Sequence, residues 1–69
     1  MMSLADLAYE YDWNNWGDKF IRDKAEHSLV IDIKLKCFYI QKSNIEINIL
    51  SNLTDAKIRQ IIKLFGCKI

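Results

Sequence analysis

The sequence is poor in the residues from which metal centres and phosphate-binding loops are built. Its 69 residues include one His, two Cys, two Gly and no Pro. His27 and the distant Cys37 and Cys67 match no zinc-ligand spacing, and no Gly-rich loop is present. No apolar run reaches half of the ~20 residues that cross a membrane, and no basic segment followed by an apolar one opens the chain. We therefore expect a soluble, cytoplasmic protein with no metal, cofactor, membrane span or signal peptide.

The chain does contain enough apolar side chains for one small domain over residues 1–69. Leu, Ile, Val and Phe make up 22 of the 69 residues, and the formal net charge is +1, which excludes a disordered segment. A domain of this size buries only about 60% of its unfolded surface, so it commonly needs a disulfide, a metal or a partner subunit. The two cysteines could form one bridge, but without an export signal we expect reduced thiols. A partner subunit is then the remaining support.

The N-terminal segment, residues 3–27, has helical spacing. Ser3 has the position of an N-cap, with an acidic residue three positions later. Asp, Asn and Gly interrupt the pattern between residues 12 and 17, which predicts one bent helix or two helices broken there. We expect Trp16 and Phe20 in the core. The stripe with steps of three and four consists of Ala5, Tyr9, Trp13, Trp16 and Phe20.

The apolar period changes from 3.6 to 2 residues at Ser28. Residues 29–40 alternate as one long strand and residues 45–49 as a second strand. A three-residue loop over residues 42–44, with Asn44 in the left-handed region and a closing bulge, keeps the two apolar faces together. The pattern predicts a β-hairpin over residues 28–50.

The last predicted element is a helix over residues 54–65. Asn52 or Thr54 can cap it, and Gly66 can end it in the left-handed conformation. The order of elements indicates an α+β fold, a small α-β-β-α domain with an antiparallel hairpin packed against N- and C-terminal helices.

The first predicted strand is much longer than the second, so residues 29–34 are left without a partner in the chain. An exposed apolar strand edge pairs readily with another strand. Antiparallel pairing with a second copy around Ile31 or Asp32 would give a four-stranded sheet across a two-fold axis. We therefore predict a homodimer with Leu29, Ile31 and Ile33 at its interface. The alternative is a first strand that begins later.

The sequence does not predict catalysis. It offers no nucleophile with a base and an orienting group, and no carboxylate pair in a pocket. His27 could activate the Cys37 thiol, but nothing in the sequence places the two together. A His at a helix end is the ordinary interpretation of this residue. We therefore expect a protein that is not an enzyme.

Protein binding has the strongest sequence pattern. Residues 9–16 hold four large aromatic side chains and two acidic ones. Trp and Tyr dominate binding hot spots, and acidic neighbours suit a basic partner, although a small core needs the same aromatic side chains. The predicted protein-binding site comprises Tyr9, Glu10, Tyr11, Asp12 and Trp13.

Composition indicates a kind of source for this chain, and the source in turn indicates a kind of partner. Ile, Lys and Asn make up 24 of the 69 residues, and these amino acids have AT-rich codons. A tiny AT-biased reading frame fits a phage or mobile element in a bacterial host. We expect a stoichiometric inhibitor or regulator of another protein, for example an antagonist of a host defence complex such as an anti-CRISPR protein.

Nucleic-acid binding is the alternative function. All ten Lys and Arg residues lie after residue 18, and the first 18 residues carry four acidic side chains and no basic one. Lys34 and Lys36 on an outer sheet face, with Phe38 beside them, would provide phosphate contacts and a stacking platform. Arg is scarce, however, and no DNA-binding motif is present. The alternative site comprises Lys34, Lys36, Lys57, Arg59 and Lys63.

Overall fold

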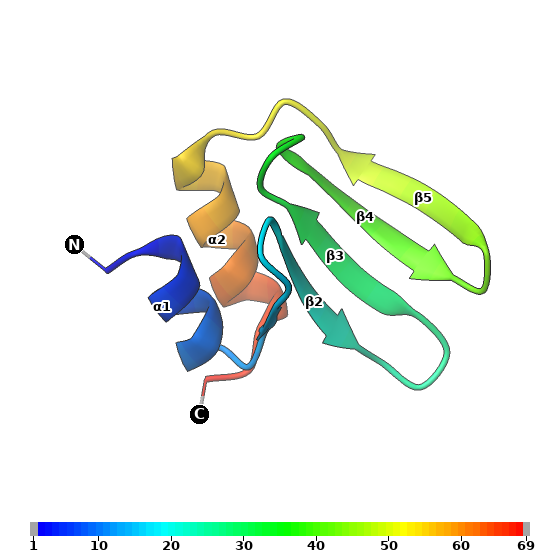
Figure 1. Ribbon diagram of the computed structural model, residues 1–69, viewed down its shortest axis with the longest axis horizontal. Helices are drawn as coiled ribbons and strands as arrows, with labels where there is room; N and C mark the ends of the chain where they lie inside the picture. The colour runs from blue at the N-terminus through cyan, green and yellow to red at the C-terminus, as the bar shows by residue number, and fades with distance from the viewer. Residues whose placement is uncertain (1, 69) are drawn as a thin grey trace.

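The computed structural model describes residues 2–68, which form two helices and one five-stranded sheet. In chain order the elements are α1 (Leu4–Glu10), β1 (Asn14–Asn15), β2 (Lys19–Asp23), β3 (Ser28–Asp32), β4 (Cys37–Lys42), β5 (Ile45–Leu50) and α2 (Asp55–Phe65). The sheet is antiparallel, and each strand pairs with its neighbour in the chain. Both helices pack on one face, which gives two layers (Figure 1). The predicted α+β class is confirmed.

α1 is much shorter than the predicted helical segment of residues 3–27. Ser3 caps its start, as the sequence predicts. Asp12 then adopts a left-handed φ of 64°. The N–H of Trp13 donates to the carbonyl of Ala8 at 2.8 Å, which closes the last turn. The prediction of a bent or broken helix through residue 27 is wrong because this turn reverses the chain.

Residues 14–23 form a β1–β2 hairpin instead of a second helix. In its turn, the N–H of Trp16 donates to the carbonyl of Lys19 at 2.8 Å, and Gly17 adopts a φ of 83°. Phe20 reaches the core from β2, so its predicted burial is right although its predicted element is wrong. The helical spacing is misleading here because a turn residue and a strand residue happen to lie four positions apart.

The predicted long strand over residues 29–40 is divided by a turn at residues 33–36. The carboxylate of Asp32 accepts the N–H of Leu35 at 2.8 Å, and Lys36 adopts a φ of 55°. These local contacts bend the chain and create an additional strand. Residues 28–50 therefore contain three strands, β3 to β5, rather than a two-stranded hairpin.

The β4–β5 turn also differs from the predicted loop. Lys42 pairs directly with Ile45, so the turn has two residues, and Ser43 rather than Asn44 has positive φ. The bulge lies at the far end of the hairpin. There Phe38 faces Leu50 and Tyr39 faces Asn48, which leaves one additional residue on β5.

β3 is a central strand, and this contradicts the predicted strand-pairing dimer. It pairs with β2 on one side and β4 on the other, so residues 28–32 have no free edge. Leu29 and Ile31 are buried in the core, and Ile33 lies in the following turn. An interface made of Leu29, Ile31 and Ile33 is therefore ruled out because those backbone groups are already paired within the chain.

The core lies between the helices and one face of the sheet. Phe20, Ile31 and Phe38 face it from three neighbouring strands. α2 contributes the stripe Ile58, Ile61 and Ile62, which follows the predicted helical spacing. Thr54 caps this helix by accepting the N–H of Lys57.

Candidate functional site: an apolar surface beside β5

All six residues of β5 are exposed, although the strand is rich in aliphatic side chains. Ile45 and Ile47 are 63% and 55% exposed. Because Ile47 faces Ile40 across the β4–β5 pair, its side chain lies on the same sheet face as Ile40, the face that carries the helices. The described core takes side chains from β2, β3 and β4 but none from β5. In Figure 1 the two helices are drawn at the left, near β2, whereas β5 is drawn at the right, so the helices do not extend over β5. Part of the helix-side face is therefore uncovered.

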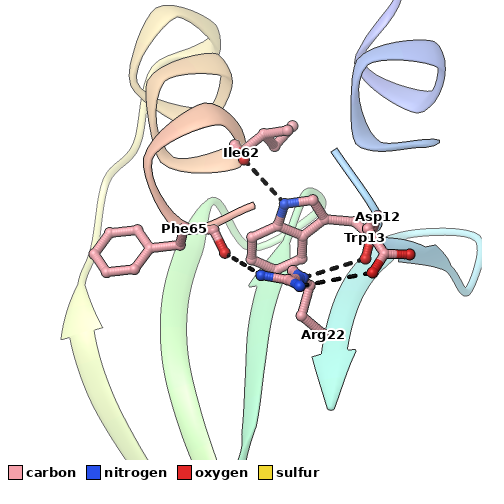
Figure 2. Close-up of polar contacts among 5 residues, drawn as sticks. All are labelled: Asp12, Trp13, Arg22, Ile62 and Phe65. Carbon is pink, nitrogen blue, oxygen red and sulfur yellow. Dashed lines mark hydrogen bonds and ion pairs between the residues drawn. The ribbon is translucent and has the colours of Figure 1, made fainter. Parts of the chain in front are cut away.

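The C-terminal end of α2 continues this uncovered apolar area. Leu64 is 69% exposed and Phe65 is 45% exposed. The ring of Phe65 lies 5.2 Å from that of Phe38, measured between centroids, with the two planes at 48°. Figure 2 shows this ring pointing away from Trp13 and Arg22. We call the combined area the β5 apolar surface, and its residues are Ile40, Ile45, Ile47, Leu64 and Phe65.

Arg22 holds the end of α2 in place. Its Nη1 donates to the carbonyl of Phe65 at 2.7 Å, and its Nε donates to the carbonyl of Asp12 at 3.2 Å (Figure 2). Its Nη2 also lies 3.6 Å from the carboxylate of Asp12. The last carbonyls of a helix lack intrahelical partners and carry partial negative charge, so a guanidinium is a suitable cap. Arg22 thereby fixes the position from which Phe65 reaches the β5 apolar surface.

A groove of about 680 Å³ separates the end of α2 from the sheet. Its charged side chains are basic, and no Asp or Glu lines it. The residues that line it are Arg22, Lys24, His27, Leu29, Ile40, Leu64, Phe65, Gly66 and Cys67. The groove is therefore lined by apolar and basic side chains.

The predicted aromatic and acidic site is divided between surface and core. Tyr9 is 78% exposed, whereas Trp13 is only 3% exposed. Glu10 lies 3.5 Å from the ammonium of Lys68, and Asp12 is engaged by Arg22. Tyr11 packs against the core. The inclusion of Trp13 in a binding site is wrong because its side chain is inaccessible to a partner.

The two tryptophans exchange their expected places. Trp16, which the helical stripe places in the core, is 69% exposed at the β1–β2 turn. Trp13 is buried instead, and its Nε1 donates to the carbonyl of Ile62 at 3.0 Å (Figure 2). The reversal follows from the chain direction, since the turn after α1 points Trp13 inward and carries Trp16 to the tip of a hairpin.

The basic residues of the alternative site do not form the predicted stacking surface. Phe38 is buried on the helix side, so no aromatic ring accompanies Lys34 and Lys36, which lie in the turn after β3. Lys36 is paired with Asp55 at 3.5 Å. The remaining members lie on α2: Lys57 and Lys63 are exposed, and Arg59 donates to the carbonyl of Met2.

A small hollow of about 200 Å³ lies on the other face of the sheet. Burial raises the pKa of the Cys37 thiol above its ordinary value of 9.0, and the nearby carboxylates of Asp32 and Glu46 raise it further. Burial likewise raises the pKa of Tyr39. Both cysteines are free. The lining residues are Lys19, Asp32, Leu35, Cys37, Tyr39, Glu46 and Asn48.

Comparison with protein families, with curated proteins and with solved structures finds no significant match. Neither helix of residues 2–68 is long and apolar enough to span a membrane. Within that same part of the chain, no three His, Cys, Asp or Glu side chains are grouped as metal ligands would be. The functional interpretation therefore depends on the surface geometry of this chain.

Sequence reasoning identifies β5 as a strand but does not identify its exposure. Alternating Ile residues predict a strand with one buried face, and the sequence around Ile45 and Ile47 shows this alternation although both side chains are exposed. Whether a helix covers the face depends on where α2 packs, which is a property of the whole fold. Leu64 and Phe65 carry no separate signal, since Phe65 lies at helical spacing from Ile58, Ile61 and Ile62 and is typical of a core position in the sequence.

Proposed function

We propose that this chain is a non-enzymatic binding protein that acts as a stoichiometric inhibitor or regulator of a larger protein. The observation that supports this function is the β5 apolar surface, where Ile45, Ile47 and Leu64 are each more than half exposed. Contiguous exposed apolar side chains with a polar rim are typical of protein-interaction sites. The partly exposed aromatic ring of Phe65 is a type of side chain that is enriched at the cores of protein interfaces.

The charges around the groove specify the chemistry of the partner. Lys24 and Arg22 line it and no carboxylate does, but Arg22 is already paired with Asp12. A partner segment with apolar side chains and a flanking acidic residue would be attracted to Lys24. This partner is opposite in charge to the basic one that the sequence pattern of residues 9–16 suggests, because the exposed surface lies elsewhere in the molecule.

A capture experiment with matched surface variants tests this function. Tagged wild-type protein, Leu64→Glu and Tyr9→Glu are used to capture proteins from a lysate of the source organism, with and without nuclease treatment. Both substituted side chains are highly exposed, so both variants should keep the wild-type circular dichroism spectrum. Leu64→Glu places a negative charge on the apolar surface and should abolish capture of the wild-type partner. Tyr9→Glu should retain it.

Two results would overturn the proposal. One is a partner that Leu64→Glu still captures at the wild-type level while Tyr9→Glu loses it, which would place the binding site at α1. The other is capture that disappears for all three proteins once nuclease is added, which would favour nucleic-acid binding.

A further inference from the structure

The sheet has two edges, and they differ in their capacity to pair with another strand. β1, at one edge, has only two residues. β5, at the other, has six exposed residues, no Pro, no Lys and one charged side chain, that of Glu46. Natural proteins protect free edges with Lys, Pro, β-bulges or very short strands. β1 is protected by its length, whereas the bulge of β5 lies near Leu50 and leaves residues 45–48 in regular register.

The hairpin geometry determines which backbone groups β5 presents outward. Lys42 and Ile45 flank a two-residue turn and pair with each other. In such a hairpin the flanking residues direct their N–H and C=O groups toward each other, and the direction alternates along the strand. The N–H and C=O groups of Glu46 and Asn48 therefore point to the open edge.

Symmetry limits how β5 can pair with itself. A two-fold axis perpendicular to the sheet makes the strands antiparallel and keeps the helix-side face of both copies on one side. Opposed residues must then point to the same face. The axis therefore lies between the two strands at the level of one residue, which is opposed to its own copy, and not at a level between two successive residues. An axis at Glu46 would oppose two carboxylates, and an axis at Asn48 would bring Ile47 against the bulge.

An axis at Ile47 keeps the carboxylates apart and moves the bulge residue Ile49 two positions away from the axis, opposite Ile45 of the second copy. It opposes Ile47 to its own copy and places Glu46 opposite Asn48 of the second copy, twice across the axis. The amide of Asn48 donates one N–H to the Ser51 hydroxyl at 2.7 Å, which leaves its second N–H for that carboxylate. Glu46 and Asn48 both line the hollow on the sheet face opposite the helices, so their side chains project on the same side.

We propose that two copies of this chain pair through β5 in antiparallel register centred on Ile47, forming a continuous ten-stranded sheet. The two β5 apolar surfaces then adjoin across the axis and form one extended surface. Both proposals involve Ile47, but the pairing is tested at Asn48 on the edge of β5, whereas the proposed function is tested at Leu64 on α2. The failure of one can therefore be distinguished from the failure of the other.

Charge substitutions at Asn48 test the register by the sign of their effect. Sedimentation equilibrium over a range of concentrations measures dimer dissociation for wild type, Asn48→Lys and Asn48→Glu. Asn48→Lys creates two Glu–Lys cross-strand pairs and should strengthen the dimer by about two- to thirty-fold. Asn48→Glu opposes carboxylates and should weaken it by a similar factor. Gln60→Lys and Gln60→Glu make the same charge changes on the exposed side of α2 and should leave dissociation unchanged.

A proline substitution tests the edge itself. The Asn48 N–H points away from β4, so Asn48→Pro should keep the circular dichroism spectrum of the folded chain and give a monomer. Ile47→Pro, whose N–H faces β4, should instead disrupt the β4–β5 pair.

A wild-type chain that is monomeric at every concentration would overturn the pairing, and so would a folded Asn48→Pro dimer. If Asn48→Lys weakened the dimer as much as Asn48→Glu, the axis at Ile47 would be wrong. Loss of partner capture by Leu64→Glu with an intact dimer would support both proposals independently.

Discussion

Trp13 is the residue at which the ends of three elements meet. It follows α1, precedes β1 and donates its indole N–H to the carbonyl of Ile62 in α2. The rest of the ring packs in the core. A buried carbonyl that loses its donor is costly, and so is the space left by a smaller ring. The stability of the α1–α2 layer therefore depends strongly on this one side chain.

Trp13→Phe should lower the free energy of unfolding by about 1–3 kcal/mol because it removes the indole donor. Trp16→Phe is the matched control, and its effect should remain within about 0.5 kcal/mol because the side chain is exposed. Urea denaturation followed by circular dichroism measures both variants. A larger loss for Trp16→Phe would contradict the observed placement of the two rings.

Cys37 and Cys67 should differ in their reaction with iodoacetamide. The raised pKa of Cys37 keeps its thiol protonated at neutral pH, and only the thiolate is nucleophilic. Cys67 is exposed and should be alkylated first, while the rate at Cys37 should continue to rise above pH 9.0, the ordinary thiol value. Mass spectrometry after timed quenching measures each site. Glu46→Gln removes one nearby negative charge and should accelerate the reaction at Cys37, and no change would contradict the contribution of Glu46 to the raised pKa while leaving that of burial.

At the scale of elements, the end of α2 and the turn after α1 are packed backbone to backbone. The N–H of Cys67 donates to the carbonyl of Tyr11 at 2.9 Å. A Cβ added at Gly66 would clash with the carbonyl oxygen of Ile62 in α2, and it would lie 2.6 Å from the Cβ of Tyr11 and 2.7 Å from the carbonyl oxygen of Tyr11. Gly66 has a φ of −94°, so the predicted left-handed cap is wrong. Glycine is needed here because atoms of α2 and of the turn after α1 lie too close for a side chain, and not for its backbone freedom.

Gly66→Ala should therefore destabilise the fold by about 1–3 kcal/mol through overpacking. Gly17→Asn is the matched control, because no atom lies within 4 Å of an added Cβ there and Asn tolerates its φ of 83°. Thermal unfolding measures both changes. Equal melting temperatures for Gly66→Ala and wild type would show that the contact between α2 and the α1 turn can relax without cost.

At the scale of the whole molecule, the two helices leave part of the five-stranded sheet uncovered. α1 and α2 pack over β2, β3 and β4, and β5 is left outside the core. This mismatch produces both proposed properties, since the uncovered face can receive a partner protein and the uncovered edge can receive a second copy. Leu64→Glu addresses the face and Asn48→Pro addresses the edge, so each property can be removed without the other.

The sequence by itself determined the α+β class, α2 with its Thr54 cap, and the turn between β4 and β5 to within one residue. These features depend on local chemistry, namely helical period, side-chain capping and residues that favour turns. Only the tertiary structure decided that residues 14–23 are strands, that β3 is central and that Ile45 and Ile47 stay exposed. The physical reason is that an apolar period shows which face of an element avoids water. It does not show whether the rest of the chain is large enough to cover that face.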